Sequence, residues 1–382
     1  MNGTGPAPAR GRMQWMDLLR GLAILLVMTL HISLVQQVWD GPAPHGAVLV
    51  SEAAAPFRMP ILLFSSGILL PRALAKPTPR FLAGKARSLL WPWLLWSFVM
   101  LPLAGWQMAK DPYWWSNGMY TWFLLALFVY YVIGLVTQKI NPAWIAVASV
   151  ALWTLLPPIG VHLDPYIYRP DKFLLYAVFF FAGAALRKPL TSRNVPLPVL
   201  VPAVVVALGW AAYAVWLDRA PLTPVISQIA MLIGVVAAIG IAQRLPRFWL
   251  VRGLEWIGRN SVVAYLVHLP IAELLARYLA LPAGSVGFAI SFTVTLGVCL
   301  LAIRLRPWTS FLYAFPSLDG ARVPQRAREA AAAATAPGLG AAMADDAAKV
   351  PAGAPAAVPA APVDASAPAQ DASPYARLSD AR

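Results

Sequence analysis

The stretch Leu18–Val38, LLRGLAILLVMTLHISLVQQV, decides the fold class of this chain. Its apolar character continues for about 20 residues, which is the length that an α-helix needs to cross the hydrocarbon core of a bilayer. A basic flank precedes it, as in a signal peptide, but the apolar part is too long and no small-x-small cleavage site follows. We therefore expect a retained first membrane helix.

Apolar segments of similar length recur along the rest of the chain. Of its 382 residues, 59% are hydrophobic and only 12% are charged, whereas soluble domains carry about 25% charged residues. A soluble core cannot bury so much apolar surface. The sequence predicts an all-α fold, a polytopic integral membrane helix bundle with about ten transmembrane helices. After the first, the predicted segments lie at about 50–70, 89–108, 120–137, 143–160, 172–187, 198–217, 222–243, 254–276 and 283–303.

The distribution of positive charge predicts the topology. The net charge is +14, and the basic residues sit in short loops rather than in a groove motif for nucleic acid, so no nucleic-acid partner is expected. With a cytoplasmic N-terminus, 21 of the 30 Lys and Arg residues fall on the inside and 6 on the outside, and the other three lie in the distal tail. This bias follows the positive-inside rule and favours an even number of spans. We expect cytoplasmic N- and C-termini.

Composition also divides the chain. Residues 1–14, rich in Gly, Pro, Ala and Arg, predict a disordered cytoplasmic N-terminus, and residues 15–310 the transmembrane domain. Residues 321–382 are rich in Ala and Pro and predict a disordered cytoplasmic tail, because such a segment cannot bury enough apolar area to offset its ordering entropy. The single cysteine, Cys299, excludes an intramolecular disulfide, and no metal site is predicted. The Ala-, Pro- and Arg-rich composition is typical of a high-GC bacterium, which predicts a multi-pass protein of the bacterial cytoplasmic (inner or plasma) membrane.

Ionisable residues inside apolar helices are functional candidates, because placing one there is costly. Arg20 and His31 are eleven positions apart, so on a helix they differ by only about 20° in azimuth and by about 16 Å in height. Asp17 lies one turn before Arg20 and can pair with it. Histidine suits general-base chemistry near neutral pH. The alternative, which the spacing leaves open, is that Arg20 extends to the headgroups and His31 only makes a helix contact.

Two further stretches carry candidates. In Pro56–Arg72, Arg58 lies at the outer end, while Ser65, Ser66 and Gly67 favour close helix packing. In the stretch Glu255–Glu273, Tyr265 and His268 lie one turn apart on one helix face. There is no phosphate-binding loop, dinucleotide-binding turn, H-E-x-x-H or G-x-S-x-G motif. ATP-driven transport, redox and protease chemistry are therefore disfavoured.

The ordered set of short motifs resembles the membrane acyltransferase family 3 over residues 15–305. Each motif is weak alone, and their order along the chain carries the resemblance. They are Asp17-x-x-Arg20-Gly-Leu-Ala with His31, then Phe57-Arg58-Met59-Pro60 with Phe64 and Ser66-Gly67, then Lys85–Arg87 before Pro92-Trp93, Trp122-Phe123-Leu124, Phe179-Phe180-Phe181-x-Gly183, and Ile257-Gly258-x-Asn260-Ser261 with Tyr265 and His268.

The resemblance implies transfer of an acyl group, usually acetyl, from cytoplasmic acyl-CoA to a hydroxyl of an extracytoplasmic glycan or related acceptor. Acetyl-CoA is then a co-substrate, with no permanently bound cofactor, and the partners are the lipid bilayer and the acceptor. The implied catalytic residues are His31, as general base or transient acyl carrier, Arg20 and Asp17. The implied residues for acyl-CoA are Arg20, Arg80, Lys85 and Arg87, and those for the acceptor are Arg58, Trp122, Tyr265 and His268.

Two other functions stay open at this point. The chain could be a transporter or flippase for a lipid-linked sugar or similar solute, with Arg20 and His31 as a proton relay, although no internal repeat is detected. A non-catalytic assembly subunit would tolerate substitution of both residues. Strict dependence on acyl-CoA separates the enzyme from the transporter.

Overall fold

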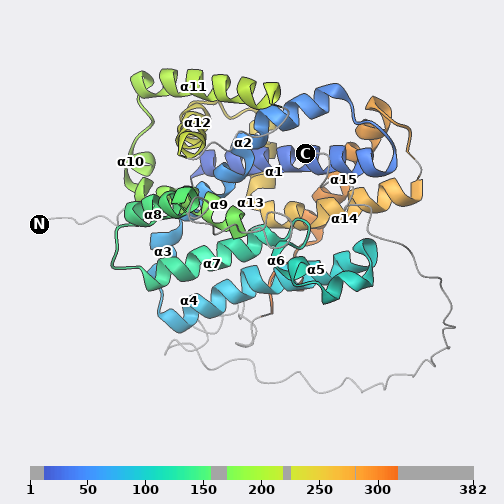
Figure 1. Ribbon diagram of the computed structural model, residues 1–382, viewed down its shortest axis with the longest axis horizontal. Helices are drawn as coiled ribbons and strands as arrows, with labels where there is room; N and C mark the ends of the chain where they lie inside the picture. Colours follow the sequence, from blue (N-terminus) through green and yellow to red (C-terminus); the bar gives the residue numbers. More distant parts are fainter. Residues whose placement is uncertain (1–12, 156–169, 218–224, 280, 317–382) are drawn as a thin grey trace, which may run out of the picture. The chain divides into compact units, whose positions relative to one another are not determined.

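The described part of the chain is helical and contains no strand, which confirms the all-α prediction. The computed structural model describes residues 13–155, 170–217, 225–279 and 281–316, so residues 1–12 and the predicted tail at 321–382 lie outside it. All the described helices belong to one of the chain's two compact units. In chain order (Figure 1) they are α1 (Gln14–Trp39), α2 (His45–Gly67), α3 (Leu70–Leu74), α4 (Thr78–Lys85), the π-helical η1 (Ala86–Leu90), α5 (Trp91–Ala104), the 3-10 helix η2 (Trp106–Lys110), α6 (Pro112–Asn117), α7 (Trp122–Val136), α8 (Pro142–Leu155), α9 (Pro170–Ala185), α10 (Arg187–Ser192), α11 (Leu197–Trp216), α12 (Ile226–Ala242), α13 (Trp249–Arg259), α14 (Ser261–Leu279), α15 (Ser285–Leu305) and the 3-10 helix η3 (Ser310–Leu312).

Five helical stretches among the described residues are long and apolar enough to cross a membrane, judged by length and composition. Four shorter apolar helices accompany them. This is the pattern of a multi-pass membrane protein. The five long stretches are Gln14–Trp39, His45–Leu74, Leu197–Trp216, Ser261–Leu279 and Ser285–Leu305, and the shorter ones are Trp122–Val136, Pro142–Leu155, Phe173–Ala185 and Ile226–Ala242.

The boundaries differ from the predicted ones at two places that affect the site. α1 begins at Gln14, so it takes in the last residue of the segment predicted to be disordered. The segment predicted at about 254–276 is two helices, α13 and α14, separated at Asn260. The Asn260 side chain donates to the carbonyl of Trp256 at 3.0 Å and so ends α13. α13 has only 11 residues and carries charged side chains, which is too short and too polar for a span.

Close backbone contact joins α1 to α13. A Cβ atom at Gly258 would overlap the carbonyl oxygen of Asp17, and one at Gly21 would overlap the carbonyl oxygen of Leu254. Only residues without a side chain let two helices approach so closely. The same arrangement joins α2 to α9, where Gly67 faces the carbonyl of Phe180. These contacts fix the height of α1, which carries the candidate residues, against its neighbours.

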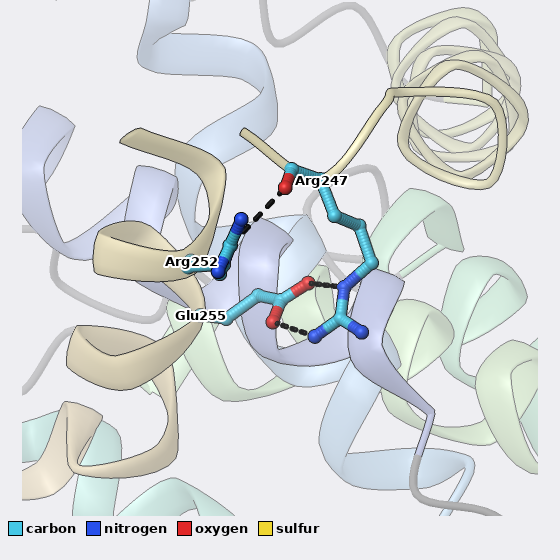
Figure 2. A network of polar contacts seen from close by, with 3 residues as sticks. All are labelled: Arg247, Arg252 and Glu255. Atoms are coloured by element: carbon cyan, nitrogen blue, oxygen red, sulfur yellow. Dashed lines mark hydrogen bonds and ion pairs between the residues drawn. The ribbon is translucent and has the colours of Figure 1, made fainter. Parts of the chain in front are cut away.

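A bidentate ion pair holds the entry to α13. Arg247 donates from Nε to Oε1 of Glu255 at 3.2 Å and from Nη2 to Oε2 at 2.8 Å, as Figure 2 shows. Arg252 Nε donates to the carbonyl of Arg247 at 3.1 Å. Glu255 is buried on the face of α13, so its carboxylate needs this partner. The pair therefore anchors the connection from α12 to the face of α13 that packs on α1.

The glycine contact generates a stability prediction. Gly258→Ala should lower the thermal unfolding midpoint of the purified protein, because the new methyl group must push α1 and α13 apart. Overpacking of this kind costs about 1–3 kcal/mol. The matched control is Gly253→Ala on the same helix, where a Cβ meets nothing within 4 Å and the better helix propensity of Ala applies. Equal midpoints for the two variants would contradict the packing described here.

Candidate active site

Two histidines from distant parts of the chain meet inside the protein. His31 lies on α1 and His268 on α14. The distance from His31 Nδ1 to His268 Nε2 is 2.9 Å, which is a hydrogen bond. The side chain of His268 is buried, with 1% of its surface exposed, and His31 is half-buried. The structure therefore brings together two residues for which separate roles were predicted.

The backbone around His268 assigns the protons of this His pair. His268 Nδ1 lies 3.2 Å from the carbonyl oxygen of Ala264, and a carbonyl can only accept. Nδ1 of His268 thus carries its proton, so in the neutral ring Nε2 is the acceptor. His31 must then donate from Nδ1, which places the lone pair of neutral His31 on Nε2. This tautomer is the one that a general base at Nε2 requires.

Tyrosine side chains form a wall beside His268. The ring of Tyr120 stands edge-on to His268, with centroids 5.7 Å apart, and that of Tyr265 lies 6.0 Å away. The two tyrosines lock each other, because Tyr265 donates to the carbonyl of Tyr120 while Tyr120 donates to the carbonyl of Leu266 at 2.7 Å. Met119, just before Tyr120, has a φ of 55°. A left-handed conformation at a residue with a side chain costs about 1–3 kcal/mol.

The basic site forms around the N-terminal part of α1. Arg20 Nη2 donates to the carbonyl of Ser65 at 3.1 Å, at the end of α2, and Arg20 is half-buried. Asp17 is buried one turn before it, beside α13. Lys85 of α4 is the second cation of the basic site, and its charge interacts with that of Arg20. Two cations from separate helices thus face one region.

Lys85 lies against an aromatic ring in a partly buried position. Its Nζ is 3.2 Å from the centroid of the Tyr131 ring, a cation–π contact, and Tyr131 donates to the carbonyl of Ser66 at 3.1 Å. Burial is the main reason why the pKa of Lys85 falls from 10.5 to about 8, and the charges of Lys76 and Arg20 lower it further. Lys85 thus loses its charge in a pH range where arginine does not.

The other cations predicted for acyl-CoA have different surroundings. Arg87 donates from Nε and Nη2 to the carbonyl of Phe315, at 3.0 and 2.9 Å, and so binds the segment after α15. Arg80 is exposed on α4. The structure therefore brings Arg20 and Lys85 together and gives Arg87 a structural partner of its own.

Two residues predicted for the acceptor lie on other helices. Arg58 Nη1 donates to the carbonyl of Ser51 at 2.8 Å and to its hydroxyl at 3.2 Å, within α2. Trp122 stacks on Tyr176, with centroids 5.5 Å apart and ring planes at 26°. Their role toward an acceptor stays a prediction.

Sequence reasoning missed a buried ion pair on the same two helices as the His pair. Glu273, five residues after His268, has no exposed surface. Its Oε2 accepts from Arg277 Nε and from Trp39 Nε1, both at 3.2 Å, and the guanidinium lies 4.6 Å from the Trp39 ring centroid. The spacing of four between Glu273 and Arg277 could have revealed the pair. Its contact with α1 could not be read from sequence.

The chain matches a known protein family. A family model described as an acyltransferase domain matches residues 13–304. The matched range includes the basic site, the His pair and the helices that carry them. Neither curated proteins nor solved structures gave a match.

Proposed function

Because this chain belongs to acyltransferase family 3, and is thus an acyltransferase enzyme, we propose that it transfers an acyl group, usually acetyl, from cytoplasmic acyl-CoA to a hydroxyl of an extracytoplasmic glycan or related acceptor. The family predicted from the sequence motifs is confirmed by the match. The identities of the acyl donor and of the acceptor, and the side of the membrane on which each binds, are the parts of this function that we propose.

The observation that carries the proposal is the placement of two chemically distinct sites on α1. The basic site of Arg20 and Lys85 supplies positive charge, which attracts the anionic phosphates of CoA. The His pair supplies a base, and His31 lies eleven residues, about 16 Å, further along the helix. A donor held by the basic site can thus extend toward a base deep in the protein.

We propose the following chemical step. Nε2 of His31 takes the proton of the acceptor hydroxyl, the oxygen forms a bond to the thioester carbonyl carbon, and the carbon–sulfur bond breaks. The departing thiolate recovers the proton from His31 and leaves as CoA thiol. His268 holds the reactive tautomer, as an orienting residue does for a catalytic histidine. In a two-step variant, Nε2 of His31 carries the acyl group before the hydroxyl receives it.

The proposed topology suits this reaction. We propose ten spans with cytoplasmic N- and C-termini, in a bacterial cytoplasmic membrane. The five long stretches and the four shorter apolar helices would supply nine of these spans, and α5 would supply the tenth. The Lys and Arg bias supports the orientation. In this proposed orientation the basic site faces the cytoplasm, where acyl-CoA is found.

Replacement of His31 tests the proposed step. His31→Ala should lower transfer of isotope-labelled acetyl from acetyl-CoA into envelope material by about 100-fold or more, because a general base contributes about that much. Arg58→Ala should mainly raise the acceptor KM. The assay uses membranes that contain equal amounts of inserted protein. Normal transfer by His31→Ala would refute the mechanism, whereas label with neither wild type nor variant, even from longer acyl-CoAs, would refute the activity.

Lys85 generates a pH prediction. Its positive charge is present below a pKa of about 8 and is lost as the pH rises through that value. If this charge attracts the CoA phosphates, kcat/KM for acetyl-CoA should fall between pH 7 and 9 in the wild type. Lys85→Arg should abolish this fall in kcat/KM, because arginine keeps its charge. Lys139→Arg, at an exposed position, is the control and should show the same fall in kcat/KM as the wild type. A fall in kcat/KM that persists in Lys85→Arg would exclude the charge of Lys85 as its cause.

A further inference from the structure

An open cleft of about 840 Å³ lies where α13 and α14 meet the end of α15. Its volume is typical of small-molecule sites. Neither the basic site nor the His pair lines it. Its lining includes aromatic, basic, amide and apolar side chains, among them Trp256, Asn260, Ile303, Arg304, Arg306 and Trp308.

The lining suits a phosphorylated nucleoside. Guanidinium groups bind phosphate through paired N–H donors, and indole rings stack on nucleobases. Trp308 presents most of its surface, 76%, to the outside, as an unoccupied stacking platform would. Arg306 is held in place, because its Nη1 donates to Oδ1 of Asn260 at 2.9 Å. The cleft thus offers both kinds of group at one place.

The wall formed by the segment after α15 is fixed to the rest of the protein. Trp91 Nε1 donates to the carbonyl of Phe311 at 2.6 Å, and Trp96 Nε1 to that of Leu312 at 2.8 Å. Arg87 binds the carbonyl of Phe315. A wall held in this way needs little reordering when a ligand binds, which favours affinity.

The cleft is aligned with the His pair. Ala264 and His268 are four residues apart on one face of α14. Asn260, four residues before Ala264, immediately precedes this helix, so His268 lies about 12 Å deeper than Asn260. Cys299 of α15, one turn deeper than Ile303, contacts the Ala264 carbonyl that also binds His268. The pantetheine arm of CoA has twelve bonds between its phosphate oxygen and its sulfur. At three bonds per extended residue, it spans about 14 Å.

We infer that this cleft binds the 3′-phosphoadenosine end of acyl-CoA. The inference rests on the proposed acyltransferase function and names the site of its donor. Trp308 and Trp256 stack on the adenine ring, and Arg304 and Arg306 bind phosphate. The pantetheine arm, about 14 Å long, can then continue along α14 toward the His pair.

The test compares donors with and without the nucleotide. Purified full-length protein in phosphatidylcholine nanodiscs is assayed for acetyl-CoA binding and for the KM of acetyl-CoA and S-acetylpantetheine. Arg304→Ala and Trp308→Ala should each weaken acetyl-CoA binding and raise its KM roughly tenfold. Neither should change the KM of S-acetylpantetheine, which lacks the nucleotide. Adenosine 3′,5′-bisphosphate should compete with acetyl-CoA in the wild type only.

Two controls match the charge and the exposed surface that the variants lose. Arg193→Ala removes an exposed arginine elsewhere, and Trp249→Ala removes a tryptophan that is 79% exposed, close to the 76% of Trp308. Both should bind acetyl-CoA as the wild type does. If the wild type transfers acetyl and both Arg304→Ala and Trp308→Ala bind acetyl-CoA with unchanged affinity, the cleft is not the nucleotide site. The acyltransferase function would then still stand. Reduced binding of phosphatidylglycerol in these variants instead would identify a lipid site. A wild type that neither binds nor uses any acyl-CoA would overturn both.

Discussion

The hydrogen bond between the imidazoles of buried His268 and half-buried His31 is the interaction on which the site depends. An imidazole inside a membrane protein is useful as a base only if its tautomer is fixed, and a ring nitrogen without a partner is costly there. His268 Nδ1 lies against the carbonyl of Ala264, and His268 Nε2 accepts from His31 Nδ1, so the backbone of α14 sets the tautomer of both rings. α1 and α14 must therefore keep their relative height to within a fraction of an ångström.

That height is set by packing rather than by the His pair itself. The contacts of Gly21 and Gly258 leave no room for α1 to slide along α13. At the other end of α1, Trp39 donates to the buried carboxylate of Glu273 on α14. The His pair thus lies between two fixed points. A tight glycine contact on one side and a polar clamp on the other let one long helix carry both a basic site and a base.

The sequence was enough to predict the membrane helices, the family, and the face of α1 that carries Arg20 and His31. Apolar length and helical periodicity are local properties, so they predicted the helices and put Arg20 and His31 on one side. They could not show which neighbouring helix faces that side. The partner of His31 lies 237 positions away, and the ring beneath Lys85 belongs to another helix. The break at Asn260 was missed because the hydrogen bonds of its side chain to Trp256 and of its backbone N–H to Ile257, which end α13, cannot be read from sequence.

The most direct test of acyl transfer across the membrane is the sidedness of the reaction in oriented vesicles. Labelled acetyl-CoA, which does not cross the bilayer, is added outside inside-out vesicles that contain the acceptor in their lumen. Label should reach the luminal acceptor with wild type and not with His31→Ala, and right-side-out vesicles should need permeabilisation. Label that appears only on acceptors on the same side as acetyl-CoA would contradict a site that joins the two faces through α1.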